Sequence, residues 1–223
     1  MLWVAFVLTV AGISAHRHLL PKIPPWDHAH HPAPPAPSCP AGFACYAGGR
    51  SFAKALNAPA GSGAKLALIC TAAERCAISG VQLRVPPHVE VRMAYVDIEH
   101  QQPGLLNGGL MNIGGRVGGG SVVGTRLTFS GGKAKYAGGA VVISEQGSFT
   151  CTDCAFRDNS ARRGGGAVDN AGGSLRLIRP SFSGNQAGLG AAWGPDCYCA
   201  ASKLCVGCTC HRKGADASYC SSN

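Results

Sequence analysis

The sequence is poor in acidic residues. Only 11 of its 223 residues are Asp or Glu, against 20 Lys and Arg, which leaves a formal net charge of +9. Glycosidases and polysaccharide lyases work with clustered carboxylates, so this shortage disfavours their chemistry. Asp153, Asp158 and Asp169 lie in the second half of the chain, but their spacing identifies no catalytic pair. The positive balance favours anionic partners: acidic or sulfated polysaccharide, phospholipid or nucleic acid.

Familiar catalytic and nucleic-acid motifs are also missing. The sequence contains no Ser-His-Asp arrangement, no phosphate-binding loop and no dinucleotide fingerprint. It also lacks a basic helix with interleaved aromatic residues, which makes nucleic acid the least favoured of the anionic partners. We therefore predict no cofactor and no nucleic-acid partner.

Long apolar runs are absent except at the start of the chain. Residues 1–15, MLWVAFVLTVAGISA, form a short apolar run that ends in small residues. Such a run is typical of a secretory signal peptide, here cleaved after Ala15. It is short for a membrane span, and no other segment qualifies, so the mature chain is expected to carry no span. The predicted location is extracellular or at the cell surface.

Glycine, by contrast, is abundant, and much of it lies in a repeated string. The chain has 32 glycines, about twice the usual share. The three ungapped copies of the string are FSGGKAKYAGGA at 129–140, FRDNSARRGGGA at 156–167 and FSGNQAGLGAAW at 182–193. Their first residues, Phe129, Phe156 and Phe182, are 27 and 26 residues apart. A fixed period of about 20 to 50 residues is typical of stacked repeats.

The segments between these strings have the composition of short strands. Val, Ile, Thr and Phe predominate, apolar and polar residues alternate, and no helical face of useful length occurs. The strand segments are VVIS at 141–144, GSFTCTDCAF at 147–156 and GSLRLIRPSF at 173–182, with earlier strands expected within 65–70, 76–85 and 88–98. Several short strands joined by tight corners in each period describe one coil of a parallel β-helix.

This interpretation assigns places to the repeated residues. Equivalent residues of successive coils would lie about 4.8 Å apart, so the three phenylalanines are expected to stack inside. Asn159 and Asn185 are expected at a corner, in left-handed backbone, each bonded to its equivalent in the next coil. The Gly-Gly pairs should occupy corners that need positive φ or close backbone approach. An irregular coil is expected to start at Gly108-Gly109-Leu110.

The pairing of F-x-x-N with G-G-A resembles the repeats of the polymorphic outer membrane proteins. The resemblance covers residues 129–193 well and 100–128 loosely. It implies a right-handed parallel β-helix, and coils that act as surface, adhesive or passenger domains.

We therefore predict an all-β chain, a right-handed parallel β-helix (solenoid) with a short N-terminal cap and a Cys-rich C-terminal tail. Ser51 is expected to cap a brief helix that runs through Phe52 and Leu56 and closes the first coil. The predicted division is a signal peptide at 1–15, a Pro/His-rich linker at 16–38, the capped β-helix at 39–195 and the tail at 196–223.

An even number of cysteines in a secreted chain is normally disulfide-bonded. The spacing of Cys39 with Cys45 equals that of Cys70 with Cys76, and both pairs are expected to staple the N-terminal part. For Cys151 and Cys154, a disulfide or buried packing is favoured over a redox pair. The twelve disulfide candidates are Cys39, Cys45, Cys70, Cys76, Cys151, Cys154, Cys197, Cys199, Cys205, Cys208, Cys210 and Cys220.

Metal binding has two weaker signals. The Cys-x-x-Cys at 205–208 has zinc spacing, although a secretory route favours disulfides there. His28, His30 and His31, and His18 near the predicted new amino terminus, are plausible chelators of copper or nickel. A solvated His-rich linker is the usual meaning of such a segment, so no metal site is predicted.

The basic residues of the repeats suggest a surface. Lys133 and Lys135 of one coil and Arg162 and Arg163 of the next should lie on one edge as a positive patch, able to bind sulfate or carboxylate groups of a glycan. Solubilising charge at exposed corners is the more common meaning of such a pattern. The favoured function is a secreted, non-catalytic structural or adhesin-like protein whose partners are anionic polysaccharides or cell-surface proteins. The alternative is a small polysaccharide lyase or glycoside hydrolase on the same scaffold.

Overall fold

A computed structural model describes residues 38–57, 63–99, 107–114, 118–188, 197–199, 205–206 and 220–221. The predicted signal peptide, nearly all of the linker, the histidine candidates, Trp193, Cys208 and Cys210 lie outside the described residues.

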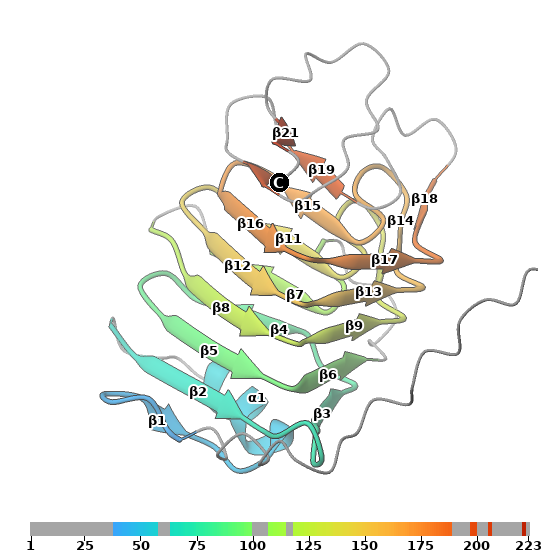
Figure 1. Ribbon diagram of the computed structural model, residues 1–223. Helices are drawn as coiled ribbons and strands as arrows, with labels where there is room; N and C mark the ends of the chain where they lie inside the picture. Colours follow the sequence, from blue (N-terminus) through green and yellow to red (C-terminus); the bar gives the residue numbers. More distant parts are fainter. Residues whose placement is uncertain are drawn as a thin grey trace, which may run out of the picture. The chain divides into compact units, whose positions relative to one another are not determined.

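The chain folds as a parallel β-helix in which successive coils add strands to four parallel sheets (Figure 1). We name the sheets A to D. Sheet A contains β1 (Ala44–Cys45), β2 (Lys65–Ile69), β5 (Glu90–Ala94), β8 (Ser121–Thr125), β12 (Ser148–Thr152), β16 (Ser174–Ile178), β20 (Cys205–Val206) and β21 (Cys220–Ser221). Sheet B contains β3 (Cys76–Ser79), β6 (Val96–Glu99), β9 (Thr128–Ser130), β13 (Ala155–Arg157) and β17 (Ser181–Ser183).

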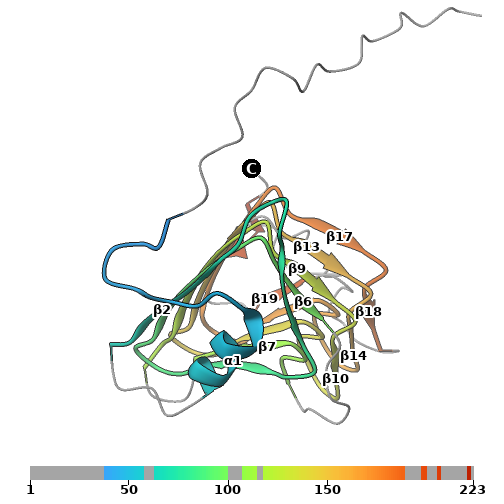
Figure 2. The same ribbon diagram turned by 90° about the horizontal axis from the view of Figure 1, so that it is seen from below.

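The other two sheets complete the coil. Sheet C contains β4 (Leu83–Val85), β7 (Met111–Ile113), β11 (Val141–Ile143), β15 (Val168–Asn170) and β19 (Cys197–Cys199). The short sheet D contains β10 (Lys133–Ala134), β14 (Ser160–Ala161) and β18 (Gln186–Ala187). Seen from the α1 end, the chain passes clockwise from sheet A through B and D to C as it recedes from the reader, so the helix is right-handed (Figure 2).

The interior is built from side chains that stack in register, as predicted. Phe129, Phe156 and Phe182 occupy equivalent positions of β9, β13 and β17. Their ring centroids are 5.0 and 5.1 Å apart, with interplanar angles of 5° and 14°. The Phe149 ring of β12 lies nearly perpendicular to the Phe129 ring, with centroids 6.0 Å apart, and joins sheet A to this stack. Parallel pairing at a constant register therefore explains the spacing of the three phenylalanines.

The predicted asparagine ladder is confirmed, but its backbone conformation differs from the prediction. The Asn159 side-chain amide donates to the Asn185 side-chain oxygen at 3.0 Å and to the Phe129 carbonyl at 3.1 Å. The Asn159 side-chain oxygen accepts from the Gly132 N–H at 2.9 Å. The left-handed residue is the one before each ladder position, Asp158 at φ 53° in this coil. Asparagine is therefore required here for its hydrogen bonds and not for its tolerance of positive φ.

The Gly-Gly pairs behave as predicted. Gly138 and Gly165 have φ of 65° and 50°, in the region that favours glycine. A Cβ on Gly139 would collide with backbone atoms of Gly166 and Ser160 in the next coil. The irregular coil is confirmed too, since Gly108 has φ of 59° and its N–H donates to the Ala137 carbonyl at 3.1 Å.

Helix α1 (Gly49–Asn57) lies across one end of the solenoid (Figure 2). Phe52 and Leu56 are fully buried in the common core, so the helix covers apolar side chains of the first coil. The predicted role of Ser51 is wrong, because the helix begins two residues earlier. The Ser51 hydroxyl lies in the first turn and donates back to the Gly48 carbonyl at 2.9 Å, so it satisfies no free N–H of the helix.

Three disulfides agree with the expected pairs: Cys39–Cys45, Cys70–Cys76 and Cys151–Cys154. Cys197 is also disulfide-bonded. The Cys151–Cys154 bridge is buried and joins the end of β12 to the start of β13. Gly124 is level with Cys151 in β8, and a Cβ there would lie only 2.8 Å from the Cys151 sulfur. The same Cβ would lie 2.5 Å from Leu127 Cδ1, so this glycine of β8 makes room for the bridge and for Leu127.

Candidate functional site

The predicted basic residues come together along sheet D. We call Lys133, Lys135, Arg162 and Arg163 the basic edge; all four are exposed. Sheet D pairs Lys133 with Ser160 and Ala134 with Ala161, which places Lys135 level with Arg162. The two alanines are buried and the residues on either side point outward, as alternation in a strand requires. The short strands β10 and β14 therefore place basic residues of successive coils next to each other, about 4.8 Å apart along the backbone.

A tyrosine that sequence analysis did not single out lies within the basic edge. Tyr136 is half-buried and level with Arg163, whose backbone N–H donates to the Tyr136 carbonyl at 2.8 Å. The Arg163 guanidinium carbon lies 4.9 Å from the centroid of the Tyr136 ring. The Lys135 ammonium lies 5.7 Å from the same centroid. One aromatic ring therefore contacts cations from two successive coils. The sequence carried one indication of this contact: Tyr136 and Arg163 occupy the same position in two successive copies of the repeated string.

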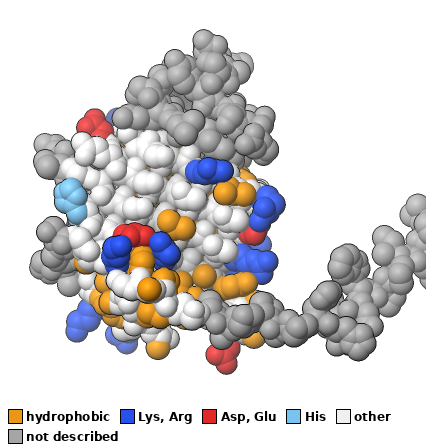
Figure 3. All heavy atoms as spheres, turned by 60° about the vertical axis from the view of Figure 1, so that its left-hand side comes forward, with side chains coloured by type: hydrophobic (Ala, Val, Ile, Leu, Met, Phe, Trp, Pro, Cys, Tyr) orange, Lys and Arg blue, Asp and Glu red, His pale blue; other side chains and the backbone are white. Residues whose placement is uncertain are grey.

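Some basic residues of the described surface have carboxylate partners, whereas others have none, among them Arg50, Lys54 and Arg176. Lys65 and Arg92, for example, pair with Glu90 at 3.5 and 3.1 Å. Figure 3 looks onto sheet A and shows such acidic and basic side chains in contact, mostly around the border of a largely uncharged face. Among the described residues, Lys135, Arg162 and Arg163 have no salt-bridge partner. Their positive charge is therefore not neutralised locally.

The corner between sheets A and B carries a second charged group, which we call the corner column. It consists of Tyr95, Arg126, Asp153 and Arg179, which are level with one another and all have φ near 50°. Arg126 donates to the Tyr95 hydroxyl at 2.9 Å, and Arg179 binds Asp153 with two bonds of 2.7 and 2.9 Å. The bond from Arg179 lowers the pKa of Asp153. This column has its own internal partners, whereas Lys135, Arg162 and Arg163 have no salt-bridge partner among the described residues.

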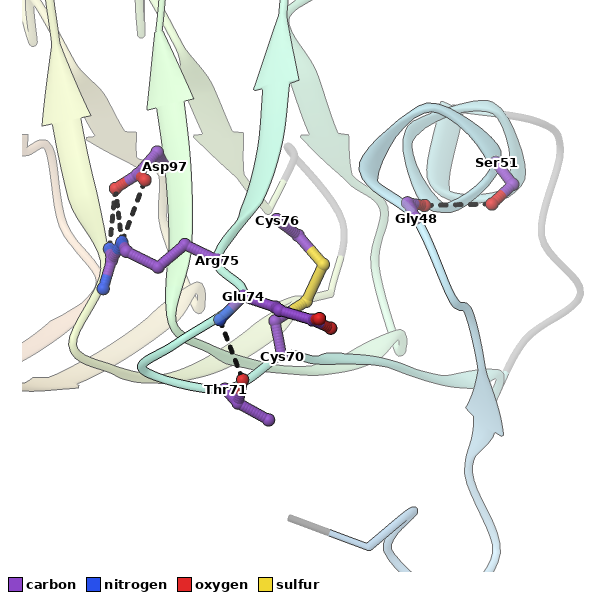
Figure 4. Close-up of a disulfide and its surroundings, with 8 residues drawn as sticks. All are labelled: Gly48, Ser51, Cys70, Thr71, Glu74, Arg75, Cys76 and Asp97. Carbon is purple, nitrogen blue, oxygen red and sulfur yellow. Dashed lines mark hydrogen bonds and ion pairs between the residues drawn. A yellow bond between two sulfur atoms is a disulfide. The ribbon is translucent and has the colours of Figure 1, made fainter. Parts of the chain in front are cut away.

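Another ion pair braces the start of the solenoid. The Cys70–Cys76 disulfide closes the loop that carries Arg75, and Arg75 reaches Asp97 on β6 of the next coil (Figure 4). The Arg75 Nη2 to Asp97 Oδ1 distance is 2.6 Å. The bond from Arg75 lowers the pKa of Asp97. The stapled loop thus serves to tie two coils together.

The three carboxylates considered for catalysis lie in three different places. Asp153 is ion-paired at the corner between β12 and β13, Asp158 is exposed between β13 and β14, and Asp169 is buried on β15. Burial raises the pKa of Asp169 to about 7, and its Oδ1 atom has no hydrogen-bond partner. The three come from separate elements of one coil and form no recognisable catalytic pair.

Within the described part of the chain, no group of three or more His, Cys, Asp and Glu side chains is arranged to hold a metal ion. No helix among the described residues is long and apolar enough to cross a membrane.

The chain was compared with models of protein families, with curated proteins and with solved structures, and none of them matches it.

Proposed function

We propose that this protein is a secreted, non-catalytic binding protein of the cell surface or extracellular matrix, and that its basic edge binds anionic polysaccharide. The observation that carries the proposal is that Lys135 of one coil lies beside Arg162 and Arg163 of the next, and that these three have no salt-bridge partner among the described residues. An anionic ligand would supply the missing charge, and exposed cations are already accessible to it.

Two further observations support this function. The F-x-x-N and G-G-A strings, which resemble the repeats of polymorphic outer membrane proteins, point to a surface or adhesive role. The three disulfides are consistent with folding in an oxidising compartment. Both fit the secretory leader expected at residues 1–15.

The proposal is tested by retention of the secreted protein on an array of sulfated and carboxylated glycans. We expect binding that weakens as salt is raised from 0.05 to about 0.5 M, because salt screens exposed charges. The triple variant Lys135→Ala, Arg162→Ala, Arg163→Ala is expected to bind at least about tenfold more weakly, a loss that corresponds to about 1.4 kcal/mol.

A matched control keeps the net charge of that variant. Replacing Arg50, Lys54 and Arg176 by alanine also removes one lysine and two arginines, all of them exposed, from α1 and sheet A. This control should retain most of the binding. Absence of binding to every glycan, or equal losses in the two variants, would show that the basic edge is not the site.

The alternative function, a polysaccharide lyase or hydrolase, draws its support from Asp169, since a carboxyl that titrates near pH 7 suits proton transfer. Its low exposure, 6%, argues against contact with a polymer. Incubation with pectate, alginate and sulfated glycans, followed by assay of reducing ends and unsaturated products, separates the two functions. Turnover that disappears in Asp169→Asn or Asp158→Asn would replace the binding proposal with the enzymatic one.

A further inference from the structure

We infer that the basic edge binds a linear polyanion lying along the solenoid axis. We also infer that Tyr136 is a positioning residue, which restricts the Lys135 and Arg163 side chains of the basic edge before the ligand binds. This inference rests on the proposed function and adds to it the class of ligand, its direction and a residue outside the predicted set.

The direction of the ligand follows from the register of sheet D. Lys135 and Arg162 are level in neighbouring coils, as are Tyr136 and Arg163. Equivalent positions repeat at about 4.8 Å along the solenoid axis. The cations of the two coils are therefore one step apart along that axis, and they match a ligand with adjacent anionic groups. A single sulfate or carboxylate would use only part of this arrangement.

The role of Tyr136 follows from its two cation–π contacts. Lysine and arginine side chains lose considerable rotamer freedom when they are fixed by a ligand. The Tyr136 ring contacts the Arg163 guanidinium and the Lys135 ammonium before any ligand is present. Part of that freedom is thus already lost in the free protein, and this favours binding. The backbone bond from Arg163 to Tyr136 keeps the two coils level whatever side chain position 136 carries.

Two substitutions distinguish the contribution of the Tyr136 ring to binding from that of its hydroxyl. Tyr136→Phe keeps the aromatic face that the cations contact, so its affinity for heparin-derived hexasaccharide should stay within about twofold of the original value. Tyr136→Leu keeps an apolar side chain but removes the face, and we expect about five- to tenfold weaker binding. The slope of log affinity against log salt should be unchanged in Tyr136→Leu, because no charge is removed. The double variant Lys135→Ala, Arg163→Ala should reduce that slope.

The experiment is isothermal titration of the full secreted protein with heparin-derived di-, tetra- and hexasaccharides, with urea unfolding of each variant as a check on folding. NMR relaxation of the Arg163 side-chain N–H should show more motion in Tyr136→Leu than in the unmodified protein, which a purely structural role would not require. Affinity should rise at least about tenfold from di- to hexasaccharide.

Each result has a distinct meaning. Equal affinity for all three lengths would contradict the axial polyanion. Unchanged affinity and Arg163 motion in Tyr136→Leu would contradict the positioning role, while the proposed function would stand. Failure of the unmodified protein to bind any of the oligosaccharides or the glycan array would overturn the proposed function itself.

Discussion

Asn159→Ala is expected to lower the free energy of unfolding by about 3 to 5 kcal/mol, because it leaves the buried Gly132 N–H unpaired and removes the side-chain bonds to the Phe129 carbonyl and to Asn185. Asn159 is fully buried, and its side chain binds the Gly132 N–H, the Phe129 carbonyl and the Asn185 side chain. Water cannot replace these partners in a closely packed interior. Equilibrium unfolding in urea, followed by far-UV circular dichroism with the disulfides intact, measures the loss.

The same substitution one coil further on provides the control. Asn185 is half-buried, and its side-chain amide donates to the Phe156 carbonyl at 3.1 Å. Its side-chain oxygen also accepts from the Asn159 backbone N–H at 3.1 Å and from the Asn159 side-chain amide at 3.0 Å. Because this rung is closer to solvent, Asn185→Ala should be less destabilising than Asn159→Ala, by about 1 to 2 kcal/mol. If Asn159→Ala costs no more than Asn185→Ala, the ladder does not stabilise the corner as described.

Asp169→Asn is expected to stabilise the protein at neutral pH. Burial raises the folded-state pKa of Asp169 from 3.8 to about 7, and its Oδ1 atom has no hydrogen-bond partner in the fold. At pH 8 the carboxylate is therefore better solvated in the unfolded chain. The difference corresponds to about 4 kcal/mol; the expected gain is about 2 to 4 kcal/mol because a buried amide also lacks partners.

The pH dependence gives this prediction its sign. An acid whose pKa is raised by folding is disfavoured by the fold only in its charged form. The folded state is therefore more stable at low pH, where the acid is neutral, than at high pH. Its contribution to stability is lost as the pH rises from about 4 to about 7, and stays constant above that. Urea unfolding between pH 4 and pH 8 should therefore show a decline that Asp169→Asn abolishes.

Asp158→Asn is the matched control for that experiment. Asp158 lies on the same coil but is exposed, and its left-handed φ of 53° suits asparagine as well as aspartate. Its pH profile should follow that of the unmodified protein. If Asp169→Asn gives the same profile as Asp158→Asn, the Asp169 carboxylate is not held in an unfavourable environment.

The coils that were easiest to predict are those of nearly constant length. The interior positions of sheet A are Leu66, Val91, Val122, Phe149 and Leu175, at intervals of 25, 31, 27 and 26 residues. Phenylalanines or glycines that stack in register produce a visible sequence period only when the intervals are alike. The early coils have the same register in space but unequal corners, which explains why their repeat is faint in the sequence.

The corner column could not be predicted from composition. Its residues, Tyr95, Arg126, Asp153 and Arg179, share a left-handed backbone but differ in chemical type. Glycine in a sequence indicates a position that can adopt a left-handed backbone, whereas these four residue types do not. Tyr136 escaped notice for a similar reason: its importance comes from Arg163, 27 positions later, and becomes apparent only once the register of sheet D is known.

Strand pairing also continues past residue 195, through β19, β20 and β21. Local composition there is dominated by cysteine, which is typical of disulfide-linked modules and carries no strand period. The sequence boundary between β-helix and tail reflects this change in composition, and the boundaries of all four predicted segments stay predictions.

The central claim, that successive coils pair in parallel at one register on every face, is tested most directly by cysteine crosslinking. Val123 faces Thr150 on sheet A and Ser130 faces Arg157 on sheet B, both pairs 27 residues apart. We predict that Val123→Cys with Thr150→Cys, and Ser130→Cys with Arg157→Cys, each form a disulfide under mild oxidation, identified by peptide mass spectrometry. Thr125→Cys with Thr150→Cys, whose Cα atoms would be about 8 Å apart, should not. Crosslinking of that control pair, or failure of either 27-residue pair, would contradict the β-helix.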